Sequence, residues 1–364
     1  MFDLGLWLER KIFKIPECIA IDIGSSAIKV MQIVLDQDEY QINHHAIESI
    51  PPNIVIDKNI KDVDTLAARL QDLLTRHKIQ AKSAVVAVGG GGVVTRTIQL
   101  AAALSETEIE GEVYLEAQRY IPFDLEEAYF DYQVIGPSSK GPELIDVLLV
   151  AAKKNVIENK LALLELVKLK PYIVDIESLA LERAAALILD QLPPFEPDQK
   201  IGLLDIGANS MTLSVMENKN IIYSREQNFG GKQLTDEIQL RYGISFEEVS
   251  LLNKTRELPD DYFSEVLEPF KLSIIQQINR ALQFFYSSDQ HGELSHLILF
   301  GGVSKLDNLE EMVKNETKIK TIVGNPCTKM KLGKHAKAES LEQEASSLLT
   351  AVGLCLRAIY DNRN

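Results

Sequence analysis

The chain has few of the residues on which disulfide-linked or zinc-bound folds depend. Its 364 residues include three cysteines and one tryptophan. Cys18, Cys327 and Cys355 are odd in number and widely spaced, with no CxxC pair and no histidine at metal-ligand spacing. The sequence therefore excludes a disulfide scaffold and a zinc site, and it favours a reducing cytosol.

Long hydrophobic runs are also missing. No apolar run approaches the roughly 18 residues that a membrane-spanning helix needs. The first residues, MFDLGLWLERKIFKI, lack the order of a secretory signal, because Asp3 and Glu9 interrupt the apolar stretch and the basic residues follow it. Two interpretations of this start stay open: a tail packed on its own domain, or an amphipathic surface for a membrane. The second would use Phe2, Leu6, Trp7, Ile12 and Phe13 beside Arg10, Lys11 and Lys14.

Positive charge is scarce. Lysine and arginine number 38 against 53 aspartates and glutamates, which gives a net charge of −15. Such a balance repels phosphate backbones, so a nucleic acid is not an expected partner. With 46% hydrophobic and 25% charged residues, the composition is that of a folded globular protein, and the length predicts two or three domains.

The sequence contains an internal repeat. The segment IAIDIGSSAIKVMQI starts at Ile19 and IGLLDIGANSMTLSV starts at Ile201, so that Asp22 aligns with Asp205 at an offset of about half the chain. Each copy predicts a buried strand, a turn of glycine and small polar residues, and a second strand. The alternative is an ordinary pair of hairpins with acidic surface turns.

Two facing hairpins of this kind could clamp a metal-bound polyphosphate. Small residues at each turn leave backbone N–H groups open to an anion, and an aspartate can hold the water ligands of magnesium. The first copy adds Ser25, Ser26 and Lys29, although Lys29 could instead face solvent. The second copy adds Asn209 and Ser210.

Two glycine pairs follow the second copy. In NFGGKQLTDEI, Gly230 and Gly231 precede a predicted helix, where a phosphate could approach the first backbone donors; a flexible loop is the alternative. In LILFGGVSKLDNLEEMV, Gly301 and Gly302 lie between a strand and a helix-like run, where an adenine ring could lie against the backbone.

Other catalytic motifs are absent. There is no Walker A pattern, because Glu226 stands where a glycine is required five positions before Gly231. The run from Gly89 to Gly92 does not form GxGxxG and is interpreted as a structural turn. The six histidines are scattered and form no HExxH motif, and no GxSxG motif occurs, which excludes zinc and serine hydrolases.

The order of the two hairpins and the diglycine turn resembles the actin-like ATPase superfamily. The helix-forming SLALERAAALIL between the halves and SLLTAVGLCLRAIY at the end agree with it. A narrower resemblance, to the PilM family of type IV pilus assembly, lies in VVAVGGGGVVTRTIQL, EGEVYLEAQRYIPFDLEEAYFDYQVIG and DVLLVAAKKNVIENKLALLELVKLKPYIVDIESLAL. It implies an α/β fold of two duplicated αβ halves around a nucleotide cleft, with an inserted subdomain of the type shared with FtsA.

The resemblance also sets the expected boundaries. The first half should span 1–197 with the insertion at about 94–169, and the second half should span 198–364. A C-terminal helix at about 345–360 should return to the first half. The segment QLPPFEPDQK is the predicted linker between the halves. Pro171 is predicted to end the helix that directly precedes it in the sequence, NVIENKLALLELVKLK.

The same resemblance implies that ATP or ADP binds in the cleft with Mg²⁺. Asp22 and Asp205 would organise magnesium through water. Glu177 would lie near the attacking water, although an exposed carboxylate at a helix start is the alternative. Relatives often place a glutamate and a lysine in an EEAExLK-like helix; here FEEVSLLNK has Ser250 near the glutamate and moves the lysine to Lys254. The other implied contacts are Gly24, Ser25, Ser26, Lys29, Gly207, Ala208 and Asn209 for phosphate, and Gly230, Gly231, Gly301 and Gly302 for ribose and base.

The implied function is that of an ATP-binding cytoplasmic scaffold at the inner face of the inner membrane, and at most a slow ATPase. It would bind the short cytoplasmic N-terminal peptide of PilN near the inserted subdomain, with the pilus motor ATPases and the platform protein as further partners. Membrane attachment would then be mainly indirect. Nucleotide would act as an effector that sets the shape of the cleft and of a partner groove.

Two other functions are alternatives. A small-molecule kinase would need a base, for which Glu177 is the candidate. A filament-forming protein of the FtsA type would carry a membrane-targeting helix after the core, whereas here AVGLCLRAIY is followed by DNRN. Assembly into a homo-oligomer stays open.

Overall fold

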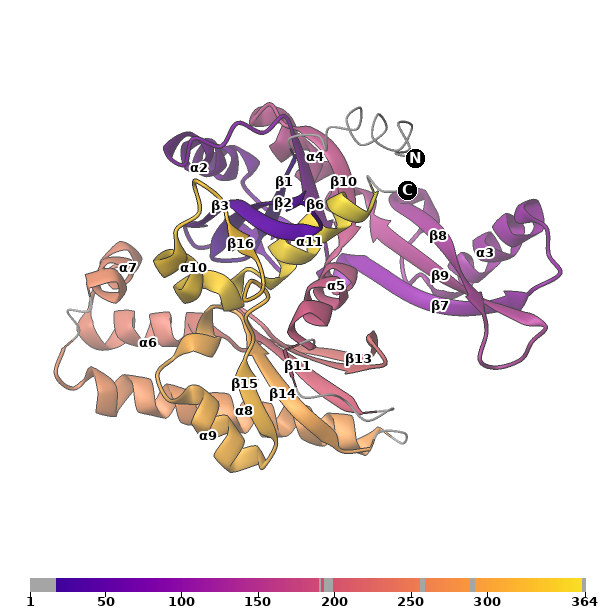
Figure 1. The fold of residues 1–364 in the computed structure, drawn as a ribbon. Coiled ribbons are helices and arrows are strands. Elements are labelled where there is room, and N and C mark those ends of the chain that lie inside the picture. Colours follow the sequence, from indigo (N-terminus) through magenta and orange to yellow (C-terminus); the bar gives the residue numbers. More distant parts are fainter. Residues whose placement is uncertain (1–17, 190, 193–198, 256–258, 289–291, 362–364) are drawn as a thin grey trace, which may run out of the picture.

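The computed structural model describes residues 18–189, 191–192, 199–255, 259–288 and 292–361. The amphipathic start and most of the predicted linker lie outside these residues. Within the described ranges, no helix is both long and apolar enough to cross a membrane. Figure 1 shows three parts: an upper half, a lower half, and a smaller sheet that projects from the upper half.

The upper, first half is built on a six-stranded sheet in the order β10-β6-β1-β2-β3-β16. The antiparallel strands β1 to β3 are the first copy of the repeat and the strand after it, and β6 and β10 join them in parallel. Every residue of β6 is buried, as expected for a strand covered on both faces. The bounds are β1 (Cys18–Ile23), β2 (Ala27–Asp36), β3 (Glu39–Ser49), β6 (Ser83–Val88), β10 (Lys170–Ile176) and β16 (Lys331–Leu332).

Alternate residues of β1 point to two different cores. Ile19, Ile21 and Ile23 pack under α2 (Val63–Arg76) and α4 (Lys154–Leu166). Ala20 points the other way, toward α5 (Glu177–Leu189) and α11 (Leu349–Asp361). The first-half sheet is therefore a middle layer between two layers of helices.

The lower, second half is a five-stranded sheet in the order β13-β12-β11-β14-β15. One face packs on α8 (Glu268–Ser287) and α9 (Leu309–Thr317). Its strands are β11 (Lys200–Ile206), β12 (Met211–Glu217), β13 (Asn220–Gln227), β14 (Leu294–Phe300) and β15 (Lys320–Val323). The remaining helices are α6 (Gly231–Tyr242), α7 (Phe246–Thr255) and α10 (Ala338–Glu344).

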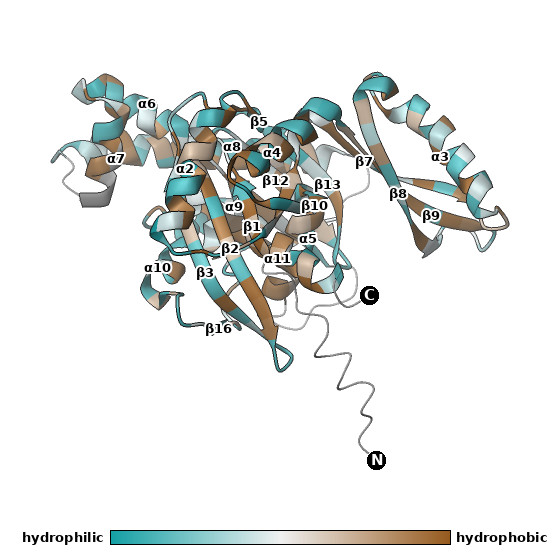
Figure 2. Cartoon of the chain, turned by 90° about the horizontal axis from the view of Figure 1, so that it is seen from above, coloured by the Kyte–Doolittle hydropathy of each residue, from teal (hydrophilic) through white to brown (hydrophobic). Residues whose placement is uncertain are grey.

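The two halves share one hydrophobic core around α5 and α11. Ile201, Leu203 and Phe300 of the second half belong to the same cluster as Ala20 of the first half. The two helices touch backbone to backbone, since a Cβ on Gly353 would lie 1.9 Å from the carbonyl oxygen of Ala180. In Figure 1, α5 and α11 lie between the two sheets, and Figure 2 shows apolar strands and helices inside with polar residues on the outer helices.

The inserted subdomain has a core of its own. Its sheet has the order β7-β9-β8, with β7 (Val93–Ala101), β8 (Ala128–Pro137) and β9 (Leu144–Lys153), and α3 (Glu106–Tyr120) covers one face. This core ends with β9, whereas the sequence-based limit ran to about 169. The difference arises because Leu163 and Leu164 of α4 pack in the core of the first half.

Pro171 also differs from its predicted role. The helix α4 ends at Leu166, and Lys168 follows with a left-handed φ of 60°. Pro171 instead lies in β10, an edge strand, at a shift in the strand register. A missing N–H is tolerated there because an edge strand has a neighbour on one side only.

Candidate functional site

The two copies of the repeat form hairpins with matching turns. In the first, the N–H of Gly24 donates to the carbonyl oxygen of Ala27 at 2.9 Å; in the second, the N–H of Gly207 donates to that of Ser210 at 2.9 Å. A Cβ on either glycine would lie 3.3 Å from the same carbonyl oxygen. Within the described chain, four backbone N–H groups of these turns have no protein acceptor: those of Ser25, Ser26, Ala208 and Asn209. The turns therefore offer donors to an anion.

Lys29 joins the aspartates of the two hairpins. It lies opposite Asp22 in the β1–β2 register, and its Nζ donates to Asp22 Oδ2 at 2.9 Å. Burial lowers the pKa of Lys29, but the nearby carboxylates of Asp22 and Asp205 outweigh it, so the pKa is raised overall. The Lys29 side chain is 22% exposed, so it does not face open solvent. Lys29 therefore lies within electrostatic range of the aspartates of both hairpins.

Asp205 occupies the corresponding place in the second hairpin, opposite Thr212 instead of a lysine. Its carboxyl reaches solvent. The surrounding protein raises the pKa of this carboxyl by desolvation, while the charges of Lys29 and Lys58 oppose the rise. The second hairpin therefore depends on lysines of the first half for its compensating charge.

Lys58 is a site residue that sequence reasoning missed. It lies on the turn between the short strands β4 (Val55–Ile56) and β5 (Asn59–Ile60). Its Nζ forms an ion pair with Glu177 Oε2 and lies 3.9 Å from Glu226 Oε2 of β13. Burial lowers the pKa of Lys58, but the two glutamates raise it above its ordinary value. A charged turn is common on any surface, so the sequence held no signal for this role.

Glu177 is held against the glycine-rich turn. It opens α5, and its side chain is 20% exposed, which differs from the alternative of an exposed helix start. A Cβ on Gly89 would lie 2.4 Å from Glu177 Oε2, and one on Gly90 would lie 3.3 Å from Lys58 Cδ. The turn that follows β6 therefore makes room for this ion pair.

The two glycine pairs pack on the second hairpin. Gly301 has a left-handed φ of +84°, and a Cβ there would lie 2.4 Å from the carbonyl oxygen of Ile206 and 2.5 Å from Asp205 Oδ1. A Cβ on Gly230 would lie 2.5 Å from the carbonyl oxygens of Gly207 and Ala208. Both pairs therefore border the predicted phosphate turn.

The first backbone N–H groups of α6 already donate hydrogen bonds to the protein. The N–H of Gly231 donates to the carbonyl oxygen of Gly207 at 3.0 Å, and that of Lys232 donates to Ala208 at 2.8 Å. These bonds dock α6 on the second hairpin, which differs from the prediction of free donors at the helix start. Contact of Gly230 and Gly231 with ribose or base stays a prediction. Lys254 lies on α7, but its side chain is outside the described residues, as is that of Ser250.

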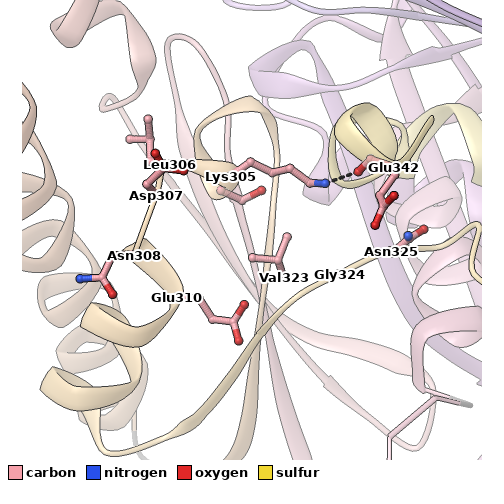
Figure 3. Close-up of a pocket in the computed structure, with 10 residues that line it drawn as sticks. Lys305, Leu306, Asp307, Asn308, Glu310, Val323, Gly324, Asn325 and Glu342 are labelled. Carbon is pink, nitrogen blue, oxygen red and sulfur yellow. Dashed lines mark hydrogen bonds between the residues drawn. The ribbon is translucent and has the colours of Figure 1, made fainter. Parts of the chain in front are cut away.

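A cavity of about 420 Å³ opens next to the diglycine turn. It lies at the carboxyl ends of β14 and β15, the edge of the sheet that also carries the second hairpin turn. Figure 3 shows Lys305 reaching across it to α10, where its Nζ donates to the carbonyl oxygen of Glu342. The lining residues are Ser304, Lys305, Leu306, Asp307, Asn308, Glu310, Val323, Gly324, Asn325 and Glu342.

The part of the chain that the structure describes contains no group of three or more histidine, cysteine, aspartate or glutamate residues arranged to hold a metal ion. Asp22 is engaged with Lys29, and Asp205 belongs to no such group in the described residues, although the charges of Asp22 and Glu177 act on it. A metal cage built from protein side chains alone is therefore not present in these ranges.

Comparison with known proteins decides the family. The family model described as type IV pilus assembly protein PilM matches residues 20–359. The chain belongs to the PilM family. This PilM-family chain is also 22% identical over 281 residues to cell division protein FtsA of Bacillus subtilis (strain 168), a match that covers 71% of this chain and 62% of FtsA. It thus spans less than two thirds of that relative's length.

Solved structures show the fold. The structure of a PilM-PilN type IV pilus biogenesis complex matches with a TM-score of 0.77 and 24% identity, over 95% of this chain and 99% of that chain. Ethanolamine utilization protein EutJ from Carboxydothermus hydrogenoformans matches with a TM-score of 0.55 and 15% identity, over 93% and 88% of the two chains. The PilM-family chain has an α/β actin-like ATPase fold, as the sequence predicted.

Proposed function

We propose that this PilM-family chain is a cytoplasmic scaffold of type IV pilus assembly whose cleft binds Mg²⁺ and ATP. Bound nucleotide sets the angle between the two halves and the shape of a groove for the cytoplasmic N-terminal peptide of PilN. The scaffold works at the inner face of the inner membrane, to which PilN links it. Hydrolysis is not required for this role, because an effector needs only different affinities for two conformations.

The observation that carries the proposal is the position of Lys29 between Asp22 and Asp205. The Lys29 ammonium group is bonded to Asp22 and lies within electrostatic range of Asp205, which supports a common cleft for the two hairpin turns and their unused N–H donors. Backbone N–H groups and a lysine suit phosphate oxygens, and two carboxylates that do not form a metal cage suit the water shell of Mg²⁺. Bound magnesium would neutralise phosphate charge. Gly24, Ser25, Ser26 and Lys29 would hold phosphates from one side, and Gly207, Ala208 and Asn209 from the other.

The nucleoside would extend from the second turn toward Gly301 and Gly302. Gly301 packs against Asp205 and Gly302 has open space beside its backbone, and the cavity that begins at Ser304 continues along the same edge of the sheet. Ligands of open α/β sheets commonly bind outside the carboxyl ends of the strands, which supports this direction.

PilN as partner is supported by the family and by the likeness to a PilM-PilN complex. The inserted subdomain also offers a suitable surface. Its strand β8 is an edge strand, and Tyr129, Phe130, Val134 and Ile135 on it are exposed. An extended peptide can add to such an edge through its main chain while apolar side chains contact the sheet.

Titration calorimetry with Mg-ATP tests the cleft. Asp205→Asn keeps the shape of the side chain and removes its charge, and we expect the affinity for Mg-ATP to fall by roughly tenfold or more. Asp72→Asn, on the exposed side of α2, removes the same charge far from the cleft and should bind as the wild type does. Undiminished affinity in Asp205→Asn would contradict the proposed cleft.

Fluorescence anisotropy of a labelled PilN N-terminal peptide tests the scaffold role. Saturating Mg-ATP should change the peptide affinity, and the peptide should change the ATP affinity by the same factor, because coupling between sites is reciprocal. A peptide that binds equally with and without nucleotide would refute the effector role while leaving ATP binding intact.

A further inference from the structure

Lys160 is a buried lysine for which the described residues provide no hydrogen bond or ion pair. It lies on α4 and is 3% exposed. Within the described residues its ammonium group makes no hydrogen bond or ion pair, whereas Lys29 is bonded to Asp22 and Lys58 to Glu177. A lysine whose side chain is buried and whose ammonium group forms no ion pair costs free energy, so such a group is expected to have an anionic ligand.

The glycine-rich turn brings Lys160 to the cleft. A Cβ on Gly92 would lie 2.9 Å from Val156 Cγ2, and Val156 is one helical turn before Lys160 on the same face of α4. The same turn contacts Glu177 at Gly89 and Lys58 at Gly90. The helix is also tied to the strand next to Lys58, because Asn159 Nδ2 donates to the carbonyl oxygen of Ile60 at 3.4 Å.

The charges around Lys160 agree with this placement. Burial lowers the pKa of its ammonium group, the carboxylates of Glu177 and Asp22 act to raise it, and Lys58 acts to lower it. Lys160 therefore lies in electrostatic range of the first hairpin and of the Lys58–Glu177 pair, on the first-half side of the cleft.

We propose that Lys160 and Lys58, over the turn from Gly89 to Gly92, form a subsite for the terminal phosphate of a nucleoside triphosphate. This inference rests on the proposed nucleotide cleft. It says that the cleft distinguishes a nucleoside triphosphate from a nucleoside diphosphate. A triphosphate carries more negative charge than a diphosphate and needs a further cation. Of Lys29, Lys58 and Lys160, Lys160 is the one whose ammonium group forms no hydrogen bond or ion pair with a carboxylate of the described residues, so the protein prefers ATP to ADP through it.

The subsite also links the terminal phosphate to both halves. Lys58 of the β4–β5 turn is shared by Glu177 at the start of α5 and Glu226 on β13 of the second half. A phosphate that draws Lys58 toward itself weakens its pairing with these glutamates. The third phosphate thereby changes the contact between the β4–β5 turn and the second half, which a diphosphate leaves in place.

The test compares Mg-ATP with Mg-ADP in Lys160→Met, by titration calorimetry on the full chain. Methionine keeps the length of the side chain and removes the charge. We expect the ATP affinity to fall by roughly tenfold or more and the ADP affinity by less than about threefold. Lys61→Met is the matched control, because this exposed lysine lies three residues after Lys58 and its side chain forms no hydrogen bond or ion pair with the described residues.

Thermal unfolding of the nucleotide-free protein supplies a second readout. Loss of an uncompensated buried charge should raise the melting temperature of Lys160→Met, while the rise caused by Mg-ATP should shrink. Lys160→Gln should shift the ATP-to-ADP ratio in the same direction, which guards against a folding defect of one variant.

The outcomes separate the subsite from the cleft. A wild-type protein that binds neither nucleotide would refute the cleft and the subsite together. Equal losses for ATP and ADP in Lys160→Met, or no loss for either, would refute the subsite alone. A lower melting temperature of the nucleotide-free variant would show that Lys160 has a structural partner and would also overturn the inference.

Discussion

Replacement of Gly301 by alanine should strongly destabilise the second half, whereas the same change at Gly302 should have little effect. At Gly301 the φ angle is +84°, and a new Cβ would lie 2.4 Å from the carbonyl oxygen of Ile206. At Gly302 a new Cβ would meet no atom within 4 Å, and the φ angle is ordinary. The two residues are adjacent, so the pair isolates the effect of backbone conformation and contact.

The size of the effect follows from two terms. At φ 84° and ψ 172° the backbone of residue 301 lies in a region that essentially only glycine adopts, and an alanine there costs about 1–3 kcal/mol. Crowding against the Ile206 backbone and Asp205 Oδ1 adds about 1–3 kcal/mol, because the backbone of β11 cannot yield as a flexible side chain would. The sum is a loss of about 2–6 kcal/mol in the free energy of unfolding at Gly301. At Gly302 we expect a change within about 0.5 kcal/mol.

Urea unfolding followed by far-UV circular dichroism measures this difference. The midpoint for Gly301→Ala should fall clearly below that of the wild type, and the midpoint for Gly302→Ala should not. Because the new methyl group displaces Asp205, Gly301→Ala should also weaken Mg-ATP binding. Equal midpoints for the two variants would refute the reasoning from geometry.

Two further predictions concern pH and the inserted subdomain. Burial, and then the charges of His77 and His44, lower the pKa of His45, so its neutral form stabilises the fold above the ordinary histidine pKa of about 6.5. That stability is lost as the pH falls below this value, because the unfolded chain binds more protons. The melting temperature should therefore drop on acidification, and it should drop less steeply in His45→Gln. Equal slopes of melting temperature against pH in the wild type and the variant would contradict this role of His45. Ser105→Ala weakens the capping box at α3, because it removes the hydroxyl that donates to Glu108 Oε2 at 2.7 Å and keeps only the backbone N–H that donates to the same oxygen at 2.8 Å. Amide exchange in the first turn of α3 should speed up several-fold with unchanged ATP affinity, and an altered affinity would contradict the separate core of this subdomain.

The repeated hairpins could be predicted from the sequence because their pattern is local. A buried strand, a small-residue turn and a second strand follow one another, so Asp22 and Asp205 are recognisable from spacing alone. The burial of Lys29 needed one further fact, its register opposite Asp22, which alternation along a two-stranded hairpin sets.

Lys58, Lys160 and Glu226 could not be predicted in the same way. They come from a short hairpin, a helix and an edge strand that are far apart in the chain, and tertiary packing alone brings them together. The predicted end of the inserted subdomain, at about residue 169, differs from the structure for a related reason. The apolar pattern of α4 predicts a helix but does not say which of two neighbouring cores its leucines enter.

The contact between Gly353 and Ala180 is suited to be the pivot between the two halves. Because α5 and α11 touch through their backbones inside a core that both sheets share, the halves cannot slide past each other without opening that core. A rotation of the halves about this contact would give a small displacement near it and a larger one with distance from it. Figure 1 shows α7 and α3 on opposite outer sides of the molecule, so they lie far from this pivot. A slight change of angle at the nucleotide cleft would move them most.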